Sequence, residues 1–157
     1  MDTEIIRNLH RPSRIKILLL GESEPAGGDF FYLEKGLFYR SIKNSIWPII
    51  KQSDVFLTDF MNRGIYLDDL VLEPIDHLSQ AERKAKSVAS IESLTRRLVE
   101  YKPEIVVSLM KGISQYVETA VTLADCQATV YTLPFPGNGH QNKFKFQIQE
   151  IFENFGG

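Results

Sequence analysis

The chain has 157 residues, of which 43% are hydrophobic and 11% aromatic, and its formal net charge at pH 7 is -2. This length and apolar content suit one globular domain over residues 1–157, with a sizeable core. The slightly acidic balance disfavours tight non-specific binding to duplex DNA, and the single cysteine, Cys126, excludes an internal disulfide.

Residues 1–14 are polar, and we expect a solvated N-terminal arm with a short helix over 4–9. The arm carries a modest basic cluster, which consists of Arg7, His10, Arg11 and Arg14. No apolar run approaches the length of a membrane span, and the arm lacks the apolar core of a signal peptide. We therefore expect a cytoplasmic protein that has no membrane partner.

Four short apolar runs alternate with segments in which apolar residues recur at helical spacing. The runs predict buried strands over 15–20, 54–60, 104–109 and 128–133. The other segments predict helices over 39–52, 79–101 (with a break near 87–90), 113–124 and 142–155. Ser79 and Glu82 fit a capping box at the start of the second of these helices. This alternation predicts a three-layer αβα sandwich around a four-stranded parallel sheet.

Two Gly-rich loops follow strands in this arrangement. The loop from 21 to 38 is rich in glycine, acidic and aromatic residues, and the loop from 134 to 140 is rich in glycine and proline. Ligands of open α/β sheets bind at the carboxyl ends of the strands, where the chain turns away and leaves a crevice. The sequence therefore predicts a ligand site between these loops. The connection 61–77 is dense in acidic residues, which face either solvent or a site.

The two loops give the chain a resemblance to the uracil-DNA glycosylase superfamily. The segment Gly21-Glu22-Ser23-Glu24-Pro25-Ala26-Gly27 resembles the family's first motif, of the type G-Q-D-P-Y or G-E-A-P-G. Leu133-Pro134-Phe135-Pro136 resembles the second motif, of the type H-P-S-P. The segment 55–59 is similar to the family strand that ends in a base-reading asparagine, and here it ends in Asp59. Leu133 stands where the family has a catalytic histidine, and leucine can neither donate to an oxyanion nor move a proton.

The resemblance implies DNA base glycosylase chemistry on a flipped or single-stranded base. Such an enzyme holds the extruded base by edge hydrogen bonds and aromatic stacking. An acid in the first loop would position water or balance the sugar cation, and a donor in the second would stabilise the departing base. The candidate catalytic residues are Glu22, Glu24 and His140. The candidate substrate-binding residues are Gly21, Ser23, Phe31, Phe38, Asp59, Pro136 and Asn138. No cofactor is implied, and the three histidines show no metal-ligand spacing.

Other interpretations stand beside this one. In a second interpretation, Glu22 bonds only within its own loop, Phe31 packs in the core, and His140 begins a helix. The protein would then be a non-catalytic module that binds a nucleobase, a nucleotide or a single strand in the same crevice. In a third hypothesis the loops bind a protein partner and the fold is only a scaffold.

Overall fold

Four parallel strands form the centre of the computed structural model, which describes residues 2–135 and 139–155. The sheet order is β2-β1-β3-β4, with β1 (Ile17–Gly21), β2 (Ile65–Asp69), β3 (Ile105–Ser108) and β4 (Thr129–Thr132). Leu19 of β1 lies opposite Leu67 and Val107 of the neighbouring strands, and all three are buried. The central strand is apolar on successive residues because helices cover both faces of the sheet.

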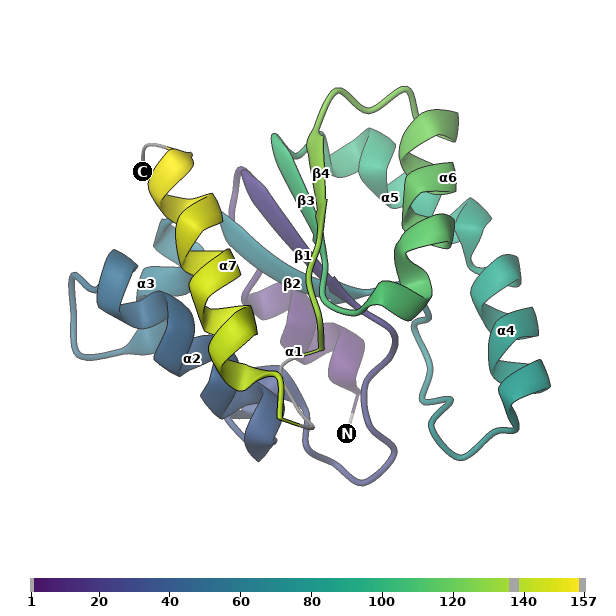
Figure 1. Cartoon of the computed structure of the whole chain (residues 1–157), viewed down its shortest axis with the longest axis horizontal. Coiled ribbons are helices and arrows are strands. Elements are labelled where there is room, and N and C mark those ends of the chain that lie inside the picture. The colour runs from purple at the N-terminus through teal and green to yellow at the C-terminus, as the bar shows by residue number, and fades with distance from the viewer. Residues whose placement is uncertain (1, 136–138, 156–157) are drawn as a thin grey trace.

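The helices form a layer on each side of the sheet, as Figure 1 shows. They are α1 (Thr3–Leu9), α2 (Gly36–Ile50), α3 (Phe56–Asn62), α4 (Gln80–Ala89), α5 (Ile91–Tyr101), α6 (Ser114–Leu123) and α7 (Gln141–Asn154). α2, α3 and α7 pack on one face, and α5 and α6 pack on the other. The chain moves one way along the sheet from β1 to β2 and the other way from β2 to β4, so right-handed crossovers place these helices on opposite faces. The predicted three-layer αβα sandwich is confirmed.

The predicted strand over 54–60 is wrong, because this segment forms α3. Phe56, Leu57 and Phe60 are buried at helical spacing, and Asp59 bonds to the loop that precedes the helix. The true second strand is β2, which lies in the stretch that the sequence assigned to an acidic connection. All five of its residues are buried, including the two aspartates at its end.

The helix predicted over 79–101 is two helices, α4 and α5, which meet at Ser90. The Ser79–Glu82 capping box at the start of α4 is present: the Ser79 hydroxyl accepts from the Glu82 amide, and the Glu82 carboxylate accepts from the Ser79 amide. The break predicted near 87–90 is confirmed, because α4 ends at Ala89 and α5 begins at Ile91.

The N-terminal segment is not a solvated arm. Its helix α1 packs beside β2, and Arg7 is only 2% exposed. Arg7 therefore belongs to the interior of the protein and not to a surface basic cluster.

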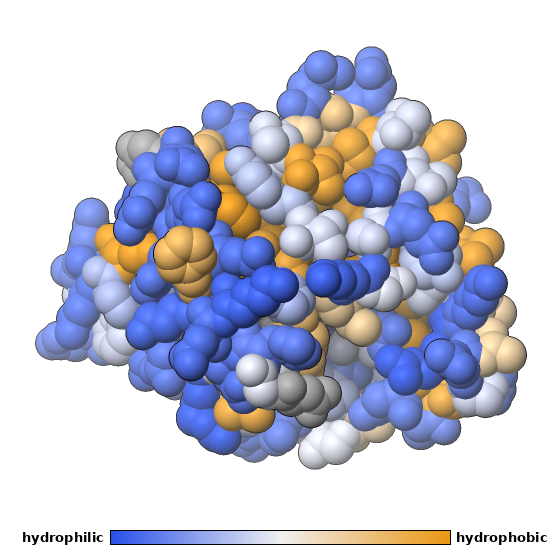
Figure 2. All heavy atoms as spheres, viewed as in Figure 1, coloured by the Kyte–Doolittle hydropathy of each residue, from blue (hydrophilic) through white to orange (hydrophobic). Residues whose placement is uncertain are grey.

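Hydrophilic residues cover most of the face seen in Figure 2, and hydrophobic residues show through between the helices. In the described part of the chain, no helix combines the length and the apolar content that crossing a bilayer requires.

Candidate functional site

A cavity of about 280 Å³ lies at the carboxyl edge of the sheet. β1 lies between β2 and β3 in the sheet. The chain first crosses from β1 to β2 and then crosses back from β2 to β3 on the other side of β1, so the order of the strands reverses at β1. In open α/β folds this reversal leaves a crevice where ligands bind. The loop after β1, the end of β2, the loop after β3 and the loop after β4 all contribute to the walls. The lining residues are Gly21, Glu22, Ser23, Glu24, Pro25, Asp29, Phe31, Phe38, Asp69, Asp76, Arg83, Leu109, Met110 and Phe135.

Aromatic side chains form one wall of the cavity. Phe38 of α2 stacks on Phe135, with ring centroids 5.8 Å apart and planes 9° from parallel. Phe31 meets Phe38 edge-on at 6.3 Å, and it is buried among the aromatic side chains of the core. Phe38 is half-buried and Phe135 is 43% exposed, so both can offer a ring face to a planar ligand.

Two acidic residues of the first loop are held in place by residues far away in the sequence. Glu22 pairs with Arg83 of α4, and its side chain is 18% exposed. Glu24 accepts a hydrogen bond from the Thr3 hydroxyl of α1, with 2.8 Å between the oxygens. Both carboxylates therefore stand at the rim of the cavity in fixed orientations.

Asp69 ends β2 and reaches the cavity from its floor. Its Oδ2 accepts from Arg7 Nη2 at 2.9 Å, and its other oxygen is turned toward Gly21. A Cβ atom at position 21 would lie 2.7 Å from Asp69 Oδ1, which is closer than real Cβ contacts. Only glycine at position 21 therefore leaves room for this carboxyl group.

The pKa of Asp69 is raised to about 7, chiefly because burial disfavours the charged form. The charge of Arg7 opposes this rise, while the charges of Asp68 and Glu24 add to it. Perturbed carboxyl groups in clefts are typical of functional sites, because they can take up and release protons near neutral pH.

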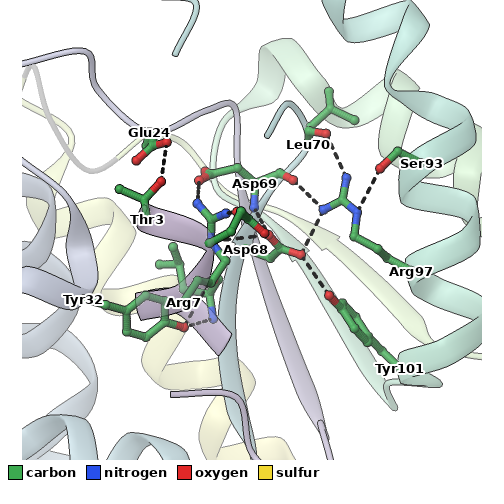
Figure 3. Close-up of polar contacts among 12 residues, drawn as sticks. Thr3, Arg7, Glu24, Tyr32, Asp68, Asp69, Leu70, Ser93, Arg97 and Tyr101 are labelled. Carbon is green, nitrogen blue, oxygen red and sulfur yellow. Dashed lines mark hydrogen bonds and ion pairs between the residues drawn. The ribbon is translucent and has the colours of Figure 1, made fainter. Parts of the chain in front are cut away.

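A buried polar network continues behind Asp69, as Figure 3 shows. Arg97 of α5 donates to Asp68 Oδ2 at 2.9 Å, and to the backbone oxygens of Asp69 and Leu70 at 2.7 and 2.9 Å. The Asp69 amide donates to Asp68 Oδ1 at 2.8 Å. These bonds fix the backbone at the end of β2, and the bond from Arg7 fixes the Asp69 carboxyl group itself.

The structure brings six of the predicted site residues to the cavity and leaves two outside it. Gly21, Glu22, Ser23, Glu24, Phe31 and Phe38 line it. Asp59 does not line it: its carboxylate accepts from Trp47 Nε1 and from the amides of the loop before α3. His140 is exposed at the start of α7 and does not line the cavity either.

Pro136 and Asn138, both candidate binding residues, lie outside the residues that the structure describes.

Asp69 is a lining residue that the sequence did not single out. A residue at the carboxyl end of a parallel strand is a candidate for the site, but β2 was not predicted as a strand because its last two residues are aspartates. Arg83 of α4, which the sequence pattern did not indicate either, is turned toward Glu22.

Within residues 2–135 and 139–155, no three histidine, cysteine, aspartate or glutamate residues gather in a way that could hold a metal ion. The sequence matches no protein-family model, and no curated protein is significantly similar to it.

Proposed function

We propose that this cavity binds a nucleobase or a nucleoside. The observation that carries the proposal is a buried carboxyl group, Asp69, on the floor of a cavity that has an aromatic wall. Proteins that hold a single base combine these two features, because ring faces are recognised by stacking and ring edges by hydrogen bonds.

The resemblance to uracil-DNA glycosylases supports this proposal when the second strand of the family is matched to β2 and not to residues 55–59. The family strand that ends in a base-reading asparagine corresponds to β2 if the second strand of each is matched, and β2 ends in Asp69. An ionised carboxylate only accepts hydrogen bonds, whereas a protonated carboxyl group also donates one. Because Arg7 holds one Asp69 oxygen, the carboxyl group offers the cavity its other oxygen, which can donate when protonated and accept when ionised. With a pKa near 7, both forms of Asp69 are present near neutral pH.

The charges around the cavity favour a ligand without phosphate groups. Five carboxyl residues line it, and among the described lining residues Arg83 is the one basic side chain and already pairs with Glu22. Phosphate-binding sites require several cations or a helix N-terminus. A free base or a nucleoside therefore fits these charges better than a nucleotide or a phosphodiester strand.

The experiment is calorimetric titration of the protein with the common nucleobases and nucleosides at pH 6. We expect saturable binding of at least one of them, which Phe38→Ala weakens by roughly 1–3 kcal/mol because a stacking surface is lost. The matched control is Phe146→Ala, since Phe146 is 68% exposed on α7 and does not line the cavity. Absence of binding at millimolar ligand, or equal binding by Phe38→Ala, would refute the proposal. A protein-interaction scaffold would give the first of these results.

A second candidate function is hydrolysis of the N-glycosidic bond of the bound nucleoside. It is favoured by the placement of a carboxylate, Glu22, and a protonatable carboxyl, Asp69, at the same cavity. Glu22 would orient water or balance the positive charge that develops on the sugar, and Asp69 would donate to the departing base.

Base release tests this second candidate. The substrates are nucleosides that carry uracil, hypoxanthine or xanthine. We expect Glu22→Gln to abolish release. Glu73→Gln should leave it unchanged, because Glu73 pairs with Lys86 on the surface. Release that survives Glu22→Gln would remove Glu22 from the mechanism.

A further inference from the structure

The orientation of α1 runs against its apolar pattern. Arg7 is 2% exposed, whereas Ile5 is 61% and Leu9 is 72% exposed. Amphipathic helices normally bury apolar residues and leave charges in water. Burying a guanidinium group is costly unless it is paired and hydrogen-bonded. Ile6 packs against the core, and the ion pairs of Arg7 add to this apolar contact in fixing how α1 packs on the sheet.

These ion pairs lead directly to the cavity. Arg7 Nη2 donates to Asp69 Oδ2 at 2.9 Å, and Arg7 Nε lies 3.6 Å from Asp68 Oδ1. The guanidinium group also pairs with Glu4 in the same helix. One helical turn before Arg7, Thr3 donates to Glu24. One short helix therefore contacts two of the carboxyl groups that line the cavity, as Figure 3 shows.

We propose that Arg7 is a positioning residue of the site, which holds one Asp69 oxygen so that the other faces Gly21 and the cavity. The proposal deepens the proposed function and rests on it for the identity of the ligand. Arg7 lines no part of the cavity, so it acts only through Asp69. The N-terminal helix is accordingly a structural part of the binding site.

Several charges act on Asp69 together with Arg7. They are Glu24 from the loop after β1, Asp68 from β2 and Arg97 from α5. Glu4 of α1 acts through Arg7, because it pairs with the Arg7 guanidinium group. A cation near a carboxyl group favours its charged form, and an anion disfavours it. Removing the charge of Arg7 should therefore raise the pKa of Asp69, and removing that of Glu4 should lower it.

The experiment is a pH titration of the ¹³C carboxyl signals of aspartate-labelled protein, without ligand. We expect Arg7→Met to raise the Asp69 midpoint by roughly 1–3 pH units, the range for an opposite charge at ion-pair distance. Glu4→Gln should lower the midpoint. Glu4 is 43% exposed, so this variant provides a test even if Arg7→Met does not fold. Arg11→Met is the control, because Arg11 pairs with Glu100 and does not contact Asp69.

A midpoint that neither Arg7→Met nor Glu4→Gln moves would overturn the proposal. So would opposite signs, or an equal response to Arg11→Met. The pH profile of nucleoside binding should move with the same midpoint in each variant. If the carboxyl midpoint moves as expected while no nucleoside binds at any pH, the coupling of Arg7 to Asp69 stands and the proposed function fails. The two failures are therefore distinguishable.

Discussion

Asp69→Asn tests the raised pKa of Asp69 through the pH dependence of the free energy of unfolding. The pKa of Asp69 is about 7 in the folded protein and 3.8 is its ordinary value, so the folded state binds the proton more tightly. Between these values the folded protein holds more protons than the unfolded chain, and the free energy of unfolding falls as the pH rises. At roughly 1.4 kcal/mol per pH unit, the contribution of Asp69 to the free energy of unfolding falls by about 4 kcal/mol over this interval. Above pH 7 the contribution is constant.

Urea unfolding of wild type and Asp69→Asn at pH 4–8 measures this effect. Asparagine is nearly isosteric with aspartate and does not titrate, so the other ionisable groups largely cancel in the difference between the two proteins. We expect the stability of wild type relative to the variant to decrease as the pH rises from 4 to 7, and then to level off. A difference that is independent of pH over this range would refute the raised pKa. A difference that increases with pH would show that Arg7 outweighs burial.

Three further substitutions have defined outcomes. Gly21→Ala should lower the free energy of unfolding by about 1–3 kcal/mol in urea and weaken nucleoside binding, because its Cβ would lie 2.7 Å from Asp69 Oδ1; unchanged binding would contradict this. Asp59→Asn should destabilise the protein, yet leave nucleoside affinity unchanged by calorimetry, because Asp59 bonds only to residues outside the cavity. Tyr32→Phe should cost roughly 1–3 kcal/mol in thermal or urea unfolding, because the Tyr32 hydroxyl accepts from the Leu67 amide and donates to the Leu67 carbonyl on the free edge of β2; a neutral effect would show that water replaces this hydroxyl.

The sequence predicted most of the fold because β1, β3 and β4 are short apolar runs separated by segments with helical spacing. It misplaced the second strand for two physical reasons. In α3, the apolar residues Phe56, Leu57 and Phe60 fit both a strand and a helix in so short a window. In β2, two carboxyl groups end the strand, and they are buried only because arginines from α1 and α5 reach them.

The site was partly predictable for the same reasons. A Gly-rich loop after a buried strand marks the carboxyl edge of a sheet, which is where Glu22 and Glu24 lie. The long-range ion pair between Arg7 and Asp69 leaves no periodic signal, since the two residues are 62 positions apart. Local patterns therefore predicted the first loop but neither the aspartate on the cavity floor nor the role of the N-terminal helix.

We propose above all that the cavity at the carboxyl edge of the sheet binds a nucleobase. The most direct measurement is a map of backbone amide shifts in ¹H–¹⁵N spectra during titration with the nucleoside that binds best. We predict saturating shifts at Gly21, Ser23 and Leu109, which lie at the end of β1 and in the loops after β1 and β3. Shifts that cluster elsewhere, or spectra that do not change at millimolar nucleoside, would contradict it.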